Sequence, residues 1–393
     1  MAVQVGNNNI FVNERARRFN AAMDRYPAAR HLEILPFLCF FAKEEVQDWH
    51  VVDLASGGGY LGNFFENVAQ KVTYVDQSSD MMKNINSDNM LVGDIRTASQ
   101  VVGENQADMV TCLAAFHHLH VPDVGQINGV YHEQGTRGWT PERYLDIHLS
   151  QQLHDDVLAD WYRMLKPGGW LVLIDVPGYP DAAWEHFWPD QQPHTLNTLG
   201  YQQQLMNRLT NWPMPTNIDI LERYFSDSWQ SLWQHDQQIQ AMRHLLTTQT
   251  DLTMHDLVQS YQLPSSLFKQ NAPMVPTDFF DDVIDRLGNQ RHYGYFPRET
   301  KVRDTLERIG MENIHTGTFP TPWVFESKEA AVWFVHELFG FKSAWSPDDI
   351  PQEEFDKLVE LLETYLGFEE DAFGRTLLFW QLSYFIGHKR SES

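Results

Sequence analysis

Short apolar runs alternate with segments of helical apolar spacing through the first half of the chain. VVDLASGGGYLG (51–62) begins with such a run, meets a glycine cluster and continues into a helical pattern. This order predicts a strand, a tight loop and a helix. Further apolar runs follow at KVTYVD (71–76), MLVGD (90–94), DMVTCLAAF (108–116) and WLVLIDV (170–176). Strands that alternate with helices favour a parallel, doubly wound α/β sheet.

The remaining segments predict helical additions to this sheet. Residues 10–46 have a helical pattern, and a long helix is expected from about Leu149 to Leu165. KVRDTLERIG (301–310) predicts a helix and MENIHTGTF (311–319) a strand, while TLLFWQLSYFIGHK (376–389) predicts a last strand at the sheet edge. We therefore divide the chain into an N-terminal helical cap (1–46), the core (47–179), a helical insertion forming a lid (180–296), the core continued (297–325), a second helical insertion (326–372), and the last strand and tail (373–393).

Composition excludes several classes of function. The chain has 393 residues, with 42% hydrophobic and 21% charged residues, which is typical of a globular protein. Its 53 acidic against 29 basic residues give a formal net charge of -24, which disfavours a nucleic-acid partner. The two cysteines, Cys39 and Cys112, are too few for a disulfide framework or a multi-cysteine zinc site and fit a reduced cytoplasmic setting. We find no secretory signal, and the longest apolar stretch is too short to span a membrane.

The glycine loop Ser56-Gly57-Gly58-Gly59 lies where an open α/β sheet binds a nucleotide-like ligand. Asp53 precedes it, and a carboxylate there is unfavourable for a pyrophosphate but suits an ammonium group. Residues 44–70 contain no Lys or Arg, so a P-loop phosphate cradle is excluded. Asp76 closes the second strand, where a carboxylate can accept both hydroxyls of a ribose. An ammonium, a ribose and no phosphate describe S-adenosylmethionine (SAM) better than NAD.

A third carboxylate extends this pattern. Asp94 follows the third strand, where it could accept from an adenine amino group, and Ile95 could pack on the ring. For each acid the alternative is a helix cap or a solvated loop end, since Asp is common at both. Acids at three strand ends of one sheet favour the ligand.

In these residues the chain resembles the class I SAM-dependent methyltransferases. VVDLASGGGYLG resembles their first motif, with Ala55 in place of the first glycine, and YVDQSSDMM resembles the second. VGDI, ADMVTCLAAFHHL and MLKPGGWLVLID resemble the following segments, and the resemblance covers about 50–178 and, more loosely, 298–319 and 375–388. It implies a seven-stranded, mostly parallel sheet with an antiparallel last strand. It also implies that SAM binds at the carboxyl ends of strands one to four, against Tyr26, Arg30, Asp53, Ala55, Ser56, Gly57, Gly59, Asp76, Gln77, Met81, Asp94, Ile95, Leu113 and Ala114.

The substrate side of the cleft has weaker candidates. His117 and His118 follow the fourth strand, where a neutral imidazole could take a proton from an acceptor, although His-His-Leu is also common there for structural reasons. No zinc spacing supports a metal site. The insertion aromatics could line a lid or merely pack it. Further polar groups that could face the cleft are His120, His132, Glu133, Asp175, Tyr179 and 291–295.

The leading hypothesis is methyl transfer from SAM to a small-molecule acceptor, O, N or C. Alternatives are a SAM-consuming lyase or cyclase on the same fold, a non-catalytic SAM-binding partner subunit and, less favoured, a NAD-dependent oxidoreductase. Apolar helical insertions could also mediate a homodimer.

Overall fold

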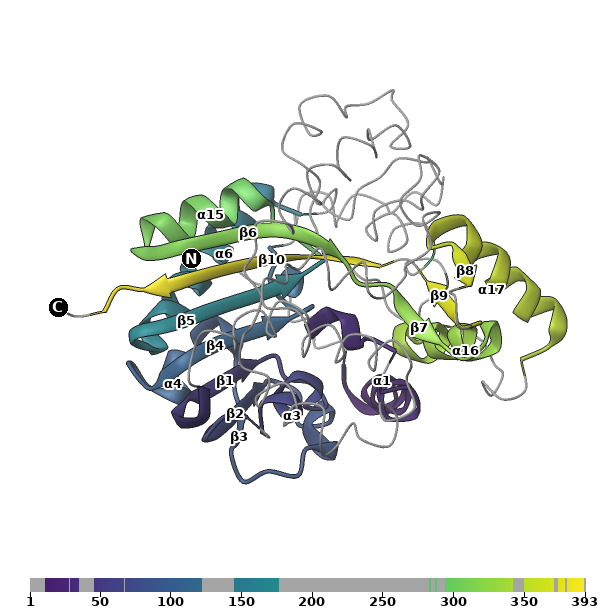
Figure 1. Ribbon diagram of the computed structural model, residues 1–393, viewed down its shortest axis with the longest axis horizontal. Helices are drawn as coiled ribbons and strands as arrows, with labels where there is room; N and C mark the ends of the chain where they lie inside the picture. The colour runs from purple at the N-terminus through teal and green to yellow at the C-terminus, as the bar shows by residue number, and fades with distance from the viewer. Residues whose placement is uncertain are drawn as a thin grey trace, which may run out of the picture.

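The computed structural model describes residues 11–27, 29–34, 46–66, 68–121, 145–176, 283, 287, 294–341, 350–370, 374–378 and 380–391. Figure 1 shows their arrangement as strands and helices. The strands are β1 (His50–Leu54), β2 (Lys71–Asp76), β3 (Met90–Val92), β4 (Ala107–Leu113), β5 (Leu165–Asp175), β6 (Met311–Pro320), β7 (Trp323–Phe325), β8 (Phe368–Glu370), β9 (Thr376–Leu378) and β10 (Gln381–Lys389). The α-helices are α1 (Asn13–Arg25), α3 (Tyr60–Glu66), α4 (Ser99–Val102), α6 (Ile147–Met164), α15 (Glu299–Arg308), α16 (Lys328–Phe339) and α17 (Gln352–Tyr365). The 3-10 helices are η1 (His31–Ile34), η2 (Val46–Asp48), η3 (Met81–Asn84), η4 (Ile95–Thr97) and η5 (Phe116–His118).

The main sheet has seven strands in the order β3-β2-β1-β4-β5-β10-β6, which can be followed from bottom to top in Figure 1. The pairs among β1, β2, β3, β4 and β5 are parallel. β10 runs antiparallel to both β5 and β6. The predicted doubly wound, seven-stranded and mostly parallel α/β fold is therefore confirmed, including its single antiparallel strand.

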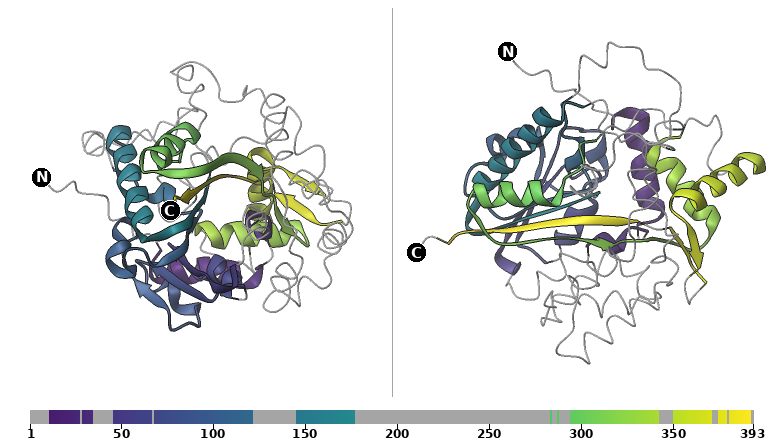
Figure 2. Two further views of the ribbon diagram at one scale, coloured as in Figure 1. Left: turned by 60° about the vertical axis from the view of Figure 1, so that its left-hand side comes forward. Right: turned by 90° about the horizontal axis from the view of Figure 1, so that it is seen from above.

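Helices cover both faces of the sheet. One face packs against the apolar sides of α1, α3 and α16, and the other packs against α6 and α15. Figure 2 shows α1 beside α16 at one end of the sheet. Two separate apolar cores result, and the carboxyl ends of the parallel strands lie at one edge between them. That edge is where open α/β sheets bind ligands.

The position of β10 differs from the prediction of an edge strand. β10 lies between β5 and β6, and β6 forms the edge. The reason is burial on both faces: Tyr384 and Ile386 belong to one core and Phe385 to the other. β6, by contrast, exposes Asn313 and His315. A continuous apolar run is typical of a strand covered on both sides, and an alternating one of a strand with a solvated face.

The second insertion is also less purely helical than predicted. α16 and α17 lie within 326–372, but β8 lies there too and joins β7 and β9 in a small sheet of order β7-β9-β8. Strands of three residues are too short to show a period. The segment between β2 and β3 contains only the single helical turn η3. Nearly all of the first insertion, 180–296, lies outside the described residues, and the domain division stays a prediction. In the described part of the chain, no helix has both the length and the apolar character needed to cross a membrane.

A buried ion pair fastens α1 to the end of α16. Arg18 donates from Nε and Nη2 to Oε1 of Glu337, at 3.0 and 2.8 Å, and both side chains are less than a tenth exposed. Arg18 also donates to the backbone carbonyls of His336 and Phe341. A cation is favoured at a helix C-terminus, where carbonyls lack intrahelical partners. This contact sets the distance of α1 from the sheet edge.

Arg18→Met should lower the free energy of unfolding by about 3–5 kcal/mol, because Glu337 would remain as a buried charge with only the His336 imidazole beside it. Adding Glu337→Met should recover much of that loss. Urea unfolding followed by circular dichroism measures both effects. Arg17→Met on the same helix is the matched control, since Arg17 is 65% exposed and should contribute little. A single variant as stable as the wild type would show that the pair does not fasten α1.

Candidate active site

A cavity of about 440 Å³ opens at the carboxyl edge of the parallel strands. Its size is in the range of small-molecule sites, about 300–1,000 Å³. Most of the residues predicted to bind the cofactor line it: Arg30, Asp53, Ala55, Ser56, Gly57, Asp76, Gln77, Met81, Asp94, Ile95, Leu113 and Ala114. His117 and His118 line it as well. Two predicted residues, Tyr26 and Gly59, are not among its lining.

The loop after β1 depends on left-handed backbone. Gly57 and Gly59 have φ of 53° and 82°, and Ala55, where the resembling motif has a glycine, has φ of 53°. A side chain at Gly59 would meet Ile85 at 2.9 Å. Gly59 therefore shapes the turn without facing the cavity, and Ala55 carries a strain that glycine would not.

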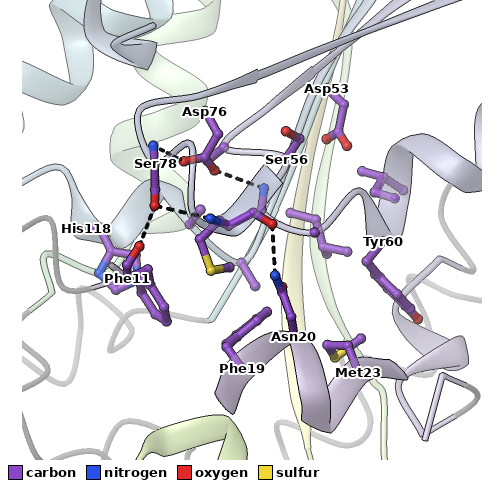
Figure 3. A pocket seen from close by; sticks show the side chains of 18 of the residues that line it. Phe11, Phe19, Asn20, Met23, Asp53, Ser56, Tyr60, Asp76, Ser78 and His118 are labelled. Atoms are coloured by element: carbon purple, nitrogen blue, oxygen red, sulfur yellow. Dashed lines mark hydrogen bonds between the residues drawn. The ribbon is translucent and has the colours of Figure 1, made fainter. Parts of the chain in front are cut away.

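Asp76 holds the loop in place at the end of β2. Its Oδ2 accepts from the backbone N–H of Gly57 at 2.9 Å, and its Oδ1 accepts from that of Ser78 at 2.8 Å (Figure 3). Burial raises the pKa of Asp76, while these two hydrogen bonds oppose the rise. Each carboxylate oxygen can accept more than one bond, so Asp76 can still receive hydroxyl donors from a ligand in the cavity.

Asp53 is a carboxyl group whose burial is incompletely compensated. It is 2% exposed, accepts a bond from the backbone N–H of Gly62, and its Oδ2 has no hydrogen-bond partner within the described residues. Burial raises its pKa to about 8, and the nearby Asp76 adds to the rise. Ser56 Oγ, also buried and lining the cavity, has no described partner either. A buried carboxylate and hydroxyl facing a cavity are expected to have ligand partners. A ligand with an ammonium group fits them.

Asp94 is more strongly engaged than the adenine role requires. Its Oδ1 caps η4 by accepting from the N–H of Arg96 at 2.9 Å, and its carboxylate forms an ion pair with the Arg96 side chain. Although burial acts to raise the pKa of Asp94, its bonds with Arg96 lower it overall. The helix cap that was the alternative to ligand binding is therefore present. Asp94 still lines the cavity, so its contact with adenine stays a prediction.

Arg30 and Tyr26 have different surroundings from those predicted. Arg30 is buried and forms an ion pair with Glu33, which also accepts from the indole N–H of Trp323 at 2.9 Å. Its guanidinium lies 5.5 Å from the ring centre of Tyr60. Arg30 thus lines the cavity, but some of its N–H donors are already bonded to Glu33. The ring of Tyr26 packs edge-on against Phe325, Trp333 and Phe334, away from the cavity lining.

Helix α1 closes the cavity from the side opposite the glycine loop. Asn20 donates to the carbonyl of Met81 at 2.9 Å, and a side chain at Gly58 would meet Asn20 Oδ1 at 2.7 Å. Phe19 and Met23 project from the same helix toward the loop in Figure 3. A larger residue at 58 would therefore have to displace the Asn20 side chain from its hydrogen bond with Met81.

His117 is held by a carboxylate at the end of β5. Its Nδ1 lies 2.6 Å from Oδ1 of Asp175, and its backbone N–H donates to Oδ2 at 2.9 Å. Asp175 is fully buried and also accepts from the N–H of Val176. The rings of His117 and His118 are 4.2 Å apart. His120 is buried, burial lowers its pKa to about 4, and it is not among the residues that line the cavity.

Several lining residues escaped the sequence analysis: Phe11, Arg15, Phe19, Asn20, Tyr60, Trp323 and Trp380. The four-residue spacing of Arg15, Phe19 and Met23 was a usable signal, because it places them on one helix face. Nothing local marks Trp323 or Trp380. Among the earlier candidates, His132, Glu133, Tyr179 and 291–293 lie outside the described residues. In the described ranges, no three His, Cys, Asp or Glu side chains gather in a way that could hold a metal ion.

Comparison with known proteins agrees with the resemblance seen in the sequence. Residues 52–128 match the family described as "Methyltransferase domain". No curated protein matches the chain. The matched segment contains the end of β1, the glycine loop and Asp76, which are the centre of the site just described.

Solved structures with a similar arrangement include three from different organisms. A SAM-dependent methyltransferase from Archaeoglobus fulgidus is 11% identical, with 94% of this chain and 99% of that chain covered at a TM-score of 0.37. The YcgJ protein from Bacillus subtilis is 12% identical over 91% and 98%, also at 0.37. A phosphoethanolamine N-methyltransferase from Haemonchus contortus, solved with phosphomonomethylethanolamine and S-adenosylhomocysteine, is 12% identical over 91% and 52%, again at 0.37.

The raised pKa of Asp53 predicts pH-dependent binding of SAM. Below pH 8 the free protein holds a proton on Asp53 that an incoming ammonium must displace, so affinity should rise with pH by up to about tenfold per unit and level off near pH 8. Calorimetry at pH 6–7 in two buffers of different ionisation enthalpy should detect about one released proton. Asp53→Asn should bind weakly and without this dependence. A wild-type affinity that does not change over pH 6–8 would contradict the prediction.

Asp53 also makes the stability of the ligand-free protein depend on pH, and this dependence has the opposite sign to that of SAM affinity. Its folded pKa lies above the unfolded value of about 3.9, so its contribution to stability is complete below that value and is lost as pH rises toward 8. Between pH 5 and 8, Asp53→Asn should therefore lose less thermal stability than the wild type does. SAM should no longer stabilise this variant.

Proposed function

We propose that this chain, which carries a class I SAM-dependent methyltransferase domain with SAM as its cofactor, transfers a methyl group to a small-molecule acceptor. The observation that carries the proposal is the buried carboxylate of Asp53, a residue that lines the cavity and whose Oδ2 has no partner among the described residues. Bound SAM supplies an electrophilic methyl group. A positive ammonium against Asp53 and ribose hydroxyls against Asp76 would orient it along the strand ends.

The residues around the bound cofactor would chiefly orient the reactants and exclude water. Leu113 and Ala114 line the cavity and would face the methionine part of the cofactor; Ala114 is fixed there because its N–H donates to the carbonyl of Ile174 at 2.7 Å. Met81 lies against Gly57, close to the proposed adenine position. Such orientation supplies much of the rate in methyl transfer, because it needs an in-line approach.

His117 is the group best placed to take a proton from the acceptor. With the Asp175 carboxylate as the acceptor at Nδ1, the proton resides on that nitrogen and Nε2 keeps its lone pair. Asp175 itself touches no reacting atom in this account and acts as a positioning residue. It fixes the imidazole through the side-chain contact and through the backbone N–H of residue 117. This arrangement favours His117 over His118 as the base.

Product analysis tests the proposed function directly. The protein is incubated with methyl-labelled SAM and a small-molecule fraction of cell extract, and products are separated by chromatography. S-adenosylhomocysteine and an equal amount of labelled small molecule are expected. Methylthioadenosine would instead indicate a lyase or cyclase, and tight SAM binding without turnover would indicate a non-catalytic subunit. Either result contradicts methyl transfer.

The two histidines are separated by matched variants. His117→Ala should lower turnover by about 10²–10⁴-fold, the range for a lost general base, while SAM affinity stays nearly unchanged. Asp175→Asn should also lower turnover and alter its pH profile, because an amide can present its NH₂ to Nδ1 and so favour the wrong tautomer. His118→Ala is the control and should keep most activity. If only His118→Ala impairs turnover, the base is His118.

A further inference from the structure

A buried guanidinium lies in the cavity apart from the residues assigned to SAM. Arg15 of α1 is 9% exposed and lines the cavity. It donates to the backbone carbonyls of Glu337 at 3.3 Å and of Leu338, at the end of α16. Gly340, the left-handed cap of α16, makes room for it, since a side chain there would meet Arg15 Cδ at 2.9 Å.

Arg15 differs from the other arginines of the cavity in having no carboxylate of its own. Arg30 pairs with Glu33, and Arg96 pairs with Asp94. The Glu337 carboxylate nearest Arg15 is engaged by Arg18, and Arg15 forms no ion pair within the described ranges. Burial lowers its pKa to about 9, as expected for an incompletely compensated cation. Buried charges are normally paired, so a partner from the cavity is expected.

An aromatic and apolar wall extends from Leu338, next to Arg15, to Trp323, which contacts Glu33 beside Arg30. Leu338, whose carbonyl accepts from Arg15, is followed by Phe339, which stacks on Trp323. Trp323 in turn stacks on Trp380 with ring centres 4.3 Å apart. These four side chains all line the cavity. On the other side of Arg15, Phe11 lies under the guanidinium at 4.8 Å.

We propose that Arg15 is the recognition site for an anionic group of the acceptor, a carboxylate or a phosphate, on a molecule with an aromatic or apolar body. This inference rests on the proposed function and specifies its substrate class. The guanidinium would pair with the anion by charge-assisted hydrogen bonds, for which arginine is well suited. The wall of Leu338, Phe339, Trp323 and Trp380 would pack against the body.

The location of Arg15 separates it from the carboxylate of SAM. The methionine end of SAM is assigned to Asp53, and Figure 3 shows Tyr60, over which Arg30 lies, on that side. Phe11 is on the opposite side of the same view, next to His118, with the two rings 5.8 Å apart. Arg15, over the Phe11 ring, therefore belongs to the side of the histidines, where the acceptor is expected.

The test uses the full-length protein saturated with S-adenosylhomocysteine and titrates benzoate, phenyl phosphate and neutral benzamide. We expect one of the two anions to bind at least about tenfold more tightly than benzamide, which also identifies the anion class. Arg15→Gln should remove this preference and leave affinity for S-adenosylhomocysteine unchanged. Arg17→Gln is the matched control, with the same loss of charge on the same helix, and should keep the preference.

Three results would overturn the proposal: no preference for either anion in the wild type, a preference that survives in Arg15→Gln, or a variant that loses S-adenosylhomocysteine instead. If Arg15→Gln does not fold, Arg15→Lys takes its place. It keeps the charge but not the fork, so the anion should bind several-fold more weakly, and unchanged binding overturns the proposal. If S-adenosylhomocysteine does not bind even the wild type, the proposed function fails, and the same titrations without it still decide the role of Arg15.

Discussion

The site depends on a carboxylate that the fold buries without giving it a cation. Asp53 lies inside β1 because the apolar strand continues on both sides of it, and packing of α3 and Tyr74 removes water from that position. Its Oδ2 therefore has no partner among the described residues, and a ligand in the cavity is expected to supply one. Such a group destabilises the empty protein and makes binding of a cationic ligand more favourable. In this chain the unfavourable burial of Asp53 occurs at the carboxyl edge of the sheet, beside the glycine loop that Asp76 holds in place.

Helix α1 turns this edge into an enclosed site. It is tied on one side to the segment after β2, through Asn20 and the carbonyl of Met81, and on the other to the end of α16 through Arg18. Its inward face thus lies over the glycine loop. The second insertion contributes to the site through α16. The C-terminal carbonyls of this helix accept hydrogen bonds from the arginines of α1, and its Phe339 lines the cavity. At Phe339, an aromatic residue of the insertion therefore lines the cavity in addition to packing against its neighbours.

The sequence predicted the central half of the fold well, and it predicted most of a set of residues that gather at one cavity, because both leave a local pattern. A strand, glycine loop and helix in succession, with acids at strand ends, leave a readable pattern. The edge position of β10 was wrong because strand order depends on burial of both faces, which Tyr384 and Phe385 reveal only in three dimensions. The surroundings of Tyr26 could not be read from the sequence, because its aromatic partners, such as Trp333, are about 300 residues away in the chain. The role of Asp94 was ambiguous in the sequence, because an aspartate after a strand suits a helix cap as well as a ligand contact. Arg15, Trp323 and Trp380 reach the cavity through packing between distant elements, and no short motif marks them.

A crystal structure of the complex with S-adenosylhomocysteine is the most direct measurement of the central claim. The account predicts the α-ammonium group within about 3 Å of Asp53 Oδ2, at hydrogen-bonding distance, with the ribose hydroxyls on Asp76. An Asp53 side chain turned away from the ligand, or a ligand held with its ammonium at another carboxylate, would contradict it.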